Sequence, residues 1–399
     1  MTVLTFVNYY LPGSRGGGPI RSIANLVRHL GGEVEFRIVT TDRDFGDQRS
    51  YSDVVPGKWH RVGNADVLYM ADKAMRLWHV RKLLSRTPCD VVYLNSFFHP
   101  RYSIQVLVLR YFGMVPDRPV VLAPRGELTA GALALKKWKK RLFLHLAGFI
   151  GLYDEVVWQA SSIQEEREIR SIFGPRSTIV RAPVLVVPDL ISPDATLSIL
   201  TRALKAKGEL RVAFLSRITR KKNLDGALRT LSLGMRGDVQ FNIYGGVDDP
   251  KYWRECQQLM RSLPENIRVR YFGPIEHSDV ASTLAKNDVF FLPTHGENFG
   301  HVVVEAMLAG CMVLISNRTP WHDLEEKGVG WTLPLEEPGS FADVLQEAID
   351  MAPEEFARRS QRAVVYGMTV SRDPETLRRN RELFKVAQRR STFNEGGRE

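Results

Sequence analysis

Short β-rich runs alternate with amphipathic or apolar helical runs along almost the whole chain. In the first half, β-rich runs lie at 3–10, 35–42, 90–96 and 119–126, and helical patterns lie near 19–30, 74–86, 100–113 and 133–147. In the second half, β-rich runs lie at 210–217, 239–246, 269–273, 288–294 and 312–316, and helical patterns follow from 223, near 250–263, near 277–287, after 300 and near 320–327. This alternation predicts parallel sheets that are covered by helices on both faces.

The length of 399 residues exceeds what a single hydrophobic core usually holds, so we expect two domains. We place one Rossmann-like domain at 1–190 and a second at 200–370, joined by the proline-containing segment 181–198. The Arg-rich tail, from about 354 to 390, has a helical pattern. The predicted architecture is two α/β domains that face each other across a cleft.

The excess positive charge is concentrated in the first half of the chain. Residues 1–190 hold 26 Lys and Arg against 17 Asp and Glu, a balance of +9, while the remainder holds 29 against 28, a balance of +1. This asymmetry indicates a partner of opposite charge for the first half. A basic nucleic-acid-binding protein is one alternative, although no nucleic-acid-binding module is recognisable.

Other features of the sequence indicate a cytoplasmic protein. Cys89, Cys256 and Cys311 show no spacing typical of a metal site, and we expect free thiols in a reducing compartment. The first ten residues have the pattern of a strand rather than a signal peptide, and no apolar run is long enough to span a membrane.

In open α/β sheets, ligands bind beyond the carboxyl ends of the strands, so the loops between strand and helix are the candidate sites. The loop at 11–22 holds three consecutive glycines, Gly16 to Gly18, with Pro19 near the start of the next helix. Glycines of this kind permit positive φ and let a phosphate or sugar approach the backbone. The alternative interpretation is a flexible connector.

A second loop places Arg217, Arg220, Lys221 and Lys222 within six residues, directly after a predicted strand. Four cations so close together repel one another unless an anion lies among them, and a diphosphate suits Arg and Lys donors. The alternative is a solvated surface turn.

A third loop precedes the apolar helical run that follows Gly300. It contains Glu297, while Glu305 lies inside the apolar run. Backbone N–H groups at such a helix start favour an anion, whereas Glu297 suits the hydroxyls of a sugar. An isolated carboxylate such as Glu305 needs hydrogen-bond donors, and two ribose hydroxyls would supply them. Solvent or a nearby Arg is the alternative.

Together these loops resemble a known family. "GENFGHVVVE" (296–305) looks like the E-x7-E motif of retaining glycosyltransferases of the GT-B fold, in particular the GT4 family. "SRITRKK" (216–222) resembles the phosphate-binding Arg/Lys loop of that family, and "GSRGGGPIRS" (13–22) resembles its glycine-rich loop. The order and spacing agree over nearly the whole chain, including a final helix, about 372–390, that crosses back to the first domain.

The resemblance implies a role for each position. Arg217 and Lys222 would neutralise the donor diphosphate, Glu297 would hold the donor sugar, and Glu305 would bind the ribose. The donor would also contact the backbone of Gly16, Gly17, Asn298, Phe299 and Gly300. Members of the family transfer a sugar from a nucleotide sugar with retention, usually without a metal or cofactor. The product implied is a polysaccharide, exopolysaccharide or lipopolysaccharide.

One departure from the family concerns the first domain, where many relatives have a histidine in a Pro-His-Gly setting. Here the sequence is "APRGELTAG" (123–131), so Arg125 occupies that place. We expect Arg125 or Glu127 to contact the acceptor or the donor sugar, the alternative for Arg125 being a surface ion pair. A nucleotide-sugar 2-epimerase of the same fold is the competing enzyme class.

The segment 135–153, "LKKWKKRLFLHLAGFIGLY", combines five cations with a tryptophan and a long apolar run. This composition is typical of a segment that touches anionic lipid headgroups. It predicts peripheral attachment to the inner face of the plasma membrane, consistent with a glycan or lipid-linked acceptor. The alternative is a buried helix with an exposed basic first turn.

Overall fold

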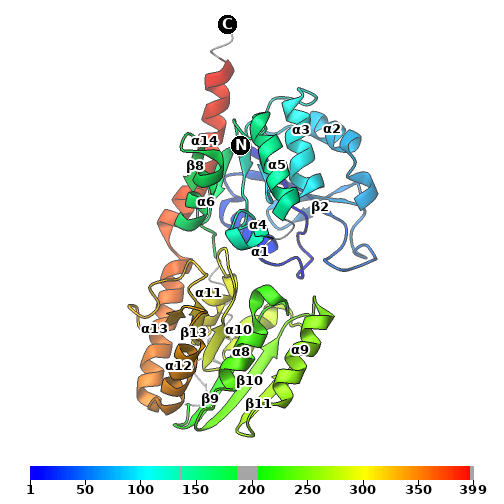
Figure 1. Cartoon of the computed structure of the whole chain (residues 1–399). Helices are drawn as coiled ribbons and strands as arrows, with labels where there is room; N and C mark the ends of the chain where they lie inside the picture. Colours follow the sequence, from blue (N-terminus) through cyan, green and yellow to red (C-terminus); the bar gives the residue numbers. More distant parts are fainter. Residues whose placement is uncertain (135–136, 187–204, 396–399) are drawn as a thin grey trace. The chain divides into compact units, whose positions relative to one another are not determined.

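The computed structural model describes residues 1–134, 137–186 and 205–395, and the chain divides into two compact units (Figure 1). Unit 1 comprises Met1–Leu185 and the C-terminal segment that begins at Asp373, and unit 2 comprises Val186–Arg372. Each unit has its own sheet and its own hydrophobic core. The predicted boundary between 190 and 200 falls outside the described residues.

Unit 1 is built on an eight-stranded sheet within the described ranges, in the order β3-β4-β2-β1-β5-β6-β7-β8. Its strands are β1 (Thr2–Phe6), β2 (Glu35–Thr41), β3 (Trp59–Val62), β4 (Ala65–Met70), β5 (Val91–Leu94), β6 (Val120–Leu122), β7 (Val157–Ala160) and β8 (Thr178–Arg181). Every pairing is parallel except that of β3 with β4. The central strands are buried along their whole length, as expected for a sheet with helices on both faces.

The helices of unit 1 include α1 (Gly18–Leu30), α2 (Leu77–Arg86), α3 (Gln105–Tyr111), α4 (Ala130–Ala134), α5 (Lys137–Phe149) and α6 (Ile163–Phe173), with single turns at η1 (Asp72–Ala74) and η2 (Pro100–Ile104). The first helix shows why the chain is helical there. Its buried residues Ile20, Ile23, Val27 and Leu30 are spaced three or four apart, and Pro19 lies in its first turn.

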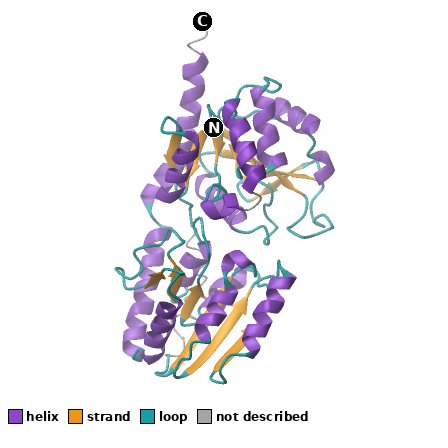
Figure 2. Cartoon of the chain, in the orientation of Figure 1, coloured by secondary structure: helices purple, strands orange, loops and turns teal. Residues whose placement is uncertain are grey.

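Unit 2 contains a six-stranded, fully parallel sheet in the order β11-β10-β9-β12-β13-β14, again counting the described residues (Figure 2). Its strands are β9 (Glu209–Leu215), β10 (Asp238–Tyr244), β11 (Ile267–Tyr271), β12 (Val289–Leu292), β13 (Met312–Ser316) and β14 (Gly330–Leu333). Its helices include α8 (Leu224–Leu231), α9 (Pro250–Arg261), α10 (Val280–Leu284), α11 (His301–Leu308), α12 (Pro338–Asp350) and α13 (Pro353–Ser371), with 3₁₀ turns at η4 (Arg220–Lys222) and η5 (His277–Asp279). The predicted alternation of strands and helices is confirmed in both units.

The final helix, α14 (Pro374–Glu395), belongs to unit 1, although α13 before it belongs to unit 2 (Figure 1). Asp373 caps α14 by accepting hydrogen bonds from the backbone N–H groups of Glu375 and Thr376. Phe384 of this helix packs edge-on against Phe36 and Tyr93 of the unit 1 sheet. The predicted return of the C-terminal helix to the first domain is confirmed.

The predicted helix near 320–327 is wrong, because this segment forms turns before β14. The Trp321 side chain donates from Nε1 to the carbonyl of Phe299 over 2.6 Å, and the Trp321 carbonyl accepts a hydrogen bond from Thr332. These tertiary hydrogen bonds hold the segment in place. Gly328, at a φ of +64°, then turns the chain into β14.

Candidate functional site

Two arginines of the cationic loop after β9 are already paired with carboxylates from elsewhere in unit 2. Arg217 forms an ion pair of 3.0 Å with Asp248, and Arg220 forms one of 2.7 Å with Glu255. The Arg220 guanidinium also lies over the Tyr252 ring, 5.0 Å from its centroid. Repulsion among the loop cations is thus relieved by the protein's own carboxylates, which the sequence interpretation did not anticipate.

Lys222 and Glu297, 75 positions apart in sequence, form an ion pair between the side chains of two loops. Both side chains are largely buried, at 16% and 12% exposure. β9 and β12 are neighbours in the parallel sheet, so the loops that follow them meet at the same edge. The structure thus brings together two residues that were assigned to the diphosphate and to the donor sugar.

Backbone and hydroxyl hydrogen bonds join these two loops independently of the ion pair. The Lys221 carbonyl accepts from the His295 N–H at 2.8 Å and from the Thr294 hydroxyl at 3.0 Å. Asn223, at a φ of +58°, donates from Nδ2 to the Pro293 carbonyl over 2.8 Å. The positions of the cations relative to Glu297 are therefore fixed by the backbone.

Lys221 is the cation of this loop that forms no ion pair or side-chain hydrogen bond with any described residue. Although the residue is exposed, desolvation by the surrounding loops lowers the pKa of its ammonium, and Lys222 and Arg217 add to that effect against the opposing influence of Glu297. Its ammonium is therefore available to an anionic ligand.

Helix α11, which follows the Glu297 loop, begins at a glycine for steric reasons. Gly300 caps α11 with a φ of +79°, and a Cβ there would lie 3.2 Å from the Val303 side chain. The ring of Phe299, the residue before it, lies 5.4 Å from Trp321 and 5.2 Å from His301. Asn298, Phe299 and Gly300 thus form a supported turn between Glu297 and α11. Glu305 follows in the helix and is buried, at 8% exposure.

In unit 1, the glycine-rich loop is held by a buried carboxylate. Asp44 accepts hydrogen bonds from the backbone N–H groups of Ser14, Arg15 and Phe45. Burial alone would raise the pKa of Asp44, but these hydrogen bonds and the nearby Arg15 outweigh it and lower the pKa. Gly17 has a φ of +82° as the cap of α1, and a Cβ on Gly16 would lie 2.5 Å from that of Tyr9. Both glycines are therefore needed by the fold itself.

The Arg125 and Glu127 region forms a tight turn at the end of β6. The Glu127 carboxylate accepts from the Ser96 hydroxyl and from the backbone N–H groups of Phe97 and Phe98, all within 2.8 Å. The Arg125 guanidinium donates to the Tyr93 hydroxyl and the Asn95 side-chain oxygen. Arg125 forms no ion pair with the described residues, so the alternative of a surface ion pair is wrong. The contact of either residue with a substrate stays a prediction.

Two residues that order these loops, Asp44 and Glu165, were missed in the sequence. Glu165, 2% exposed, accepts from the Gly126 N–H and from the N–H and hydroxyl of Ser161. Both carboxylates stand in polar stretches that look like ordinary surface sequence. Of the residues that order these loops, only Asn223 carried a signal in the sequence, because asparagine tolerates the positive φ of such a turn.

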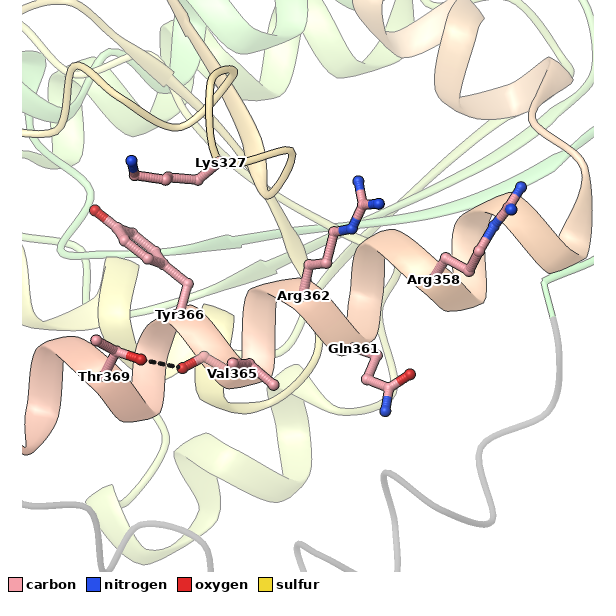
Figure 3. A pocket seen from close by; sticks show the side chains of 7 residues that line it. All are labelled: Lys327, Arg358, Gln361, Arg362, Val365, Tyr366 and Thr369. Atoms are coloured by element: carbon pink, nitrogen blue, oxygen red, sulfur yellow. Dashed lines mark hydrogen bonds between the residues drawn. The ribbon is translucent and has the colours of Figure 1, made fainter.

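An open hollow of about 420 Å³ lies along α13 and contains none of the predicted site residues (Figure 3). Its lining includes Lys327 and Arg358, which are paired with Glu326 and Glu355. Tyr366, also in the lining, donates to Asp323. We assign no role to this hollow.

Within the described ranges, no group of three or more His, Cys, Asp or Glu side chains is placed to hold a metal ion. Cys89, Cys256 and Cys311 are buried, and no disulfide joins them in the described part of the chain. None of the helices in the described part of the chain has the length and apolar character needed to cross a bilayer.

Comparison with known proteins finds a matching family model, similar curated proteins and solved structures of similar fold. Residues 199–363 match the model of a family described as glycosyl transferases group 1. An uncharacterized 41.2 kDa protein in the cps region of Klebsiella pneumoniae is 21% identical over 271 residues, which cover 66% of this chain and 70% of that protein. Phosphatidyl-myo-inositol mannosyltransferase of Mycobacterium tuberculosis is 32% identical over 114 residues, 28% of this chain and 29% of the relative.

Two solved structures share the fold at low sequence identity. Sucrose-phosphate synthase from Thermosynechococcus elongatus superposes with a TM-score of 0.73 at 14% identity, covering 96% of this chain and 98% of that one. Anabaena HepE in complex with UDP and glucose superposes with a TM-score of 0.67 at 15% identity, covering 97% and 99%. These superpositions confirm the predicted GT-B fold class.

Proposed function

We propose that this chain, which carries a domain of the glycosyl transferases group 1 family over residues 199–363, transfers a sugar from a nucleotide-sugar donor to a glycan or lipid-linked acceptor. Similarity to a protein of a cps region and to a phosphatidyl-inositol mannosyltransferase supports a role in the synthesis of polysaccharide, exopolysaccharide or lipopolysaccharide. A structural neighbour that binds UDP and glucose supports a nucleotide-sugar donor.

The observation that carries this proposal is the junction of the cationic loop with the Glu297 loop at the carboxyl edge of the unit 2 sheet. Arg217, Lys221 and Lys222 would contact the donor diphosphate there. Their positive charge would stabilise the nucleoside diphosphate as the bond to the sugar breaks, which is the main catalytic contribution we assign to the protein.

The carboxylates of Glu297 and Glu305 would bind the uncharged parts of the donor, its sugar and its ribose. Glu297 would accept hydrogen bonds from sugar hydroxyls while its ion pair with Lys222 holds it beside the phosphates. Glu305 would accept hydrogen bonds from the ribose, and the turn from Asn298 to Gly300 would face sugar and phosphate with its N–H groups. We further propose that transfer retains the anomeric configuration and requires no metal. Gly16 and Gly17 of unit 1 would let a phosphate or sugar approach their backbone.

Attachment to an anionic membrane surface through α5 is also part of the proposal. Trp138, Leu142, Leu146 and Phe149 are exposed and spaced three or four apart, so they share one face of the helix. Lys137, Lys139 and Arg141 are exposed at its first turns. The alternative of a buried helix is wrong, because Ala147 is the buried residue of α5. Lys136 lies outside the described residues.

The test is binding and turnover with the purified chain. Isothermal calorimetry with UDP and GDP identifies the nucleotide, and release of that nucleotide from its sugar conjugates in the presence of membrane extract reports transfer. We expect release to depend on the extract, and product analysis by NMR to show a retained anomeric configuration. Conversion of the free nucleotide sugar into its 2-epimer would instead establish the epimerase, and binding of neither nucleotide would refute the proposal.

A further inference from the structure

Arg125 occupies a backbone conformation that favours glycine. It follows β6 in a turn closed by a 3.2 Å hydrogen bond from the Glu127 N–H to the Pro124 carbonyl, with φ values of +56° at Arg125 and +77° at Gly126. A side chain at positive φ costs about 1–2 kcal/mol. Glycine would adopt this turn without that cost, so the presence of arginine suggests that the side chain has a function.

The turn around Arg125 is fixed by the carboxylates of Glu165, which is buried, and of Glu127, which is partly buried. Glu165 accepts from the Gly126 N–H at 2.7 Å, and Glu127 binds the loop at 96–98 through three hydrogen bonds. Neither carboxylate is paired with Arg125. Their hydrogen bonds aim the arginine side chain at the end of the neighbouring strand β5.

The guanidinium is positioned by neutral groups. Its Nη2 donates to the Tyr93 hydroxyl at 2.7 Å and to Asn95 Oδ1 at 2.8 Å, and its Nε donates to the same Oδ1 at 3.2 Å. Tyr93 is fully buried and Asn95 is 4% exposed, so both partners are rigid. Nη1 donates no hydrogen bond to the described residues. The charge is therefore held in place without being neutralised.

Another arginine of unit 1 shows the contrasting arrangement. Arg110, at 16% exposure, is paired with both Asp117 and Glu155. Arg125 is also only partly exposed, yet its partners are an amide and a phenol. A partly desolvated cation without a counter-ion is costly, and an incoming anion would remove that cost.

Asn95 supplies a second, independent observation. Its Nδ2 is buried and has no hydrogen-bond partner, while its Oδ1 is occupied by Arg125. Asn95 follows β5 and Arg125 follows β6, and these strands are adjacent at the centre of the parallel sheet. Ligands of such sheets bind beyond the carboxyl ends of the strands, where both side chains lie.

We propose that Arg125 and Asn95 form an anion subsite in unit 1 that binds a phosphate or carboxylate group of the acceptor. Arg125 Nη1 would donate a charge-assisted hydrogen bond to the anion. The anion site follows from unit 1 alone, and its assignment to the acceptor rests on the proposed function. Glu127 would act as a positioning residue, since its two oxygens are already occupied by donors from the protein.

The subsite is tested by stabilisation of the whole chain by small anions while UDP or GDP, whichever binds, saturates the donor site. The probes are methyl phosphate, methyl glucuronide and the neutral methyl glucoside at equal ionic strength, with melting temperature as the readout. We expect one of the anions, and not the glucoside, to raise the melting temperature of the wild type. Whichever anion acts distinguishes a phosphate-bearing from a carboxylate-bearing acceptor.

The diagnostic variant is Arg125→Asn, because asparagine tolerates positive φ and preserves the turn. We expect this variant to need an anion concentration about tenfold or more higher for the same rise in melting temperature, as loss of a charge-assisted hydrogen bond implies. Arg110→Gln is the matched control and should keep the effect. An anion effect that survives in Arg125→Asn, or is absent from the wild type, would overturn the proposal. Because nucleotide binding is measured separately, failure here does not count against the donor site.

Discussion

The Lys222 ammonium is ion-paired with the Glu297 carboxylate, so the group proposed for the diphosphate neutralises the group proposed for the sugar. Their loops are also joined through the Lys221 carbonyl, which fixes the two side chains at one edge of the sheet. A donor diphosphate that contacts Lys222 must therefore share that cation with Glu297. Substitution of Lys222 and substitution of Glu297 should therefore have different effects on nucleotide binding and on transfer.

Lys222→Met should weaken nucleotide binding, because it removes a cation from the phosphate site and leaves the Glu297 charge beside it. We expect the dissociation constant for UDP or GDP to rise about 10- to 100-fold, the equivalent of about 1.5–3 kcal/mol for a hydrogen bond to a charged group. Calorimetry measures it. An unchanged constant would remove Lys222 from the phosphate site.

Glu297→Gln should have the opposite signature. It removes a negative charge next to the diphosphate, so nucleotide binding should be unchanged or tighter, while transfer should fall about 100-fold or more, the scale for losing one electrostatic contact at a reacting centre. The assay is nucleotide release in the presence of acceptor. If Glu297→Gln weakens nucleotide binding as strongly as Lys222→Met does, the division of roles between them is incorrect.

Gly300→Ala should destabilise unit 2, because alanine at a φ of +79° is strained and its Cβ would approach Val303 at 3.2 Å. We expect a loss of about 1–2 kcal/mol in the free energy of unfolding. Gly296→Ala is the matched control in the same loop, since its nearest neighbour would be Lys221 Cε at 3.8 Å. Equal destabilisation by both substitutions would contradict a conformational requirement at Gly300. Urea denaturation provides the measurement.

The alternation of strands and helices was predictable because buried parallel strands and amphipathic helices leave different apolar periods in the sequence. β14 was missed, as were β3, β4, β7 and β8. In β14, Gly330 resembles a strand breaker, whereas in the fold a Cβ there would lie 2.1 Å from the Val313 carbonyl of the adjacent strand. The glycine is what allows β14 to pair. No local pattern carries that information.

The candidate loops of unit 2 were found from sequence because each follows a strand of a parallel sheet. The anchoring carboxylates were not found, because each also depends on a partner far away in the sequence: Asp44 accepts from Ser14, 30 positions away, and Glu165 accepts from Gly126, 39 positions away. In the sequence, Glu165 is one of several acids on a polar helix, and nothing local distinguishes it from exposed neighbours. The neutral environment of Arg125 depends on tertiary packing in the same way.

Asp44→Asn should destabilise unit 1 in a pH-dependent way. The folded-state pKa of Asp44 is lower than its unfolded value, so its contribution is fully present above the unfolded value of 3.8 and is lost as pH falls through the folded pKa. We expect a cost of about 1–2 kcal/mol near pH 7 that shrinks below about pH 4. Unfolding by urea at several pH values measures it. A difference that is constant with pH would show that the carboxylate charge is not what holds the glycine-rich loop.

The combined substitution of Trp138, Leu146 and Phe149 by Ser should reduce membrane binding. These side chains are 68%, 54% and 86% exposed, so the change removes apolar surface without opening the core. At about 25 cal/mol per Å² of buried apolar surface, losing them should weaken partitioning at least tenfold. Sedimentation with vesicles of equal parts phosphatidylglycerol and phosphatidylcholine measures it, and Leu233→Ser, on a residue of unit 2 that is 56% exposed, is the control.

Replacement of Lys137, Lys139 and Arg141 by Gln tests the charge component of the same surface. Each basic residue near an anionic bilayer contributes about 1 kcal/mol, so binding to phosphatidylglycerol vesicles should fall while any binding to pure phosphatidylcholine is unchanged. Added salt should reduce binding of the wild type and leave the Gln variant nearly unaffected, because salt screens the attraction. Wild-type chain that stays in solution with both kinds of vesicle would show that the exposed face of α5 does not bind lipid.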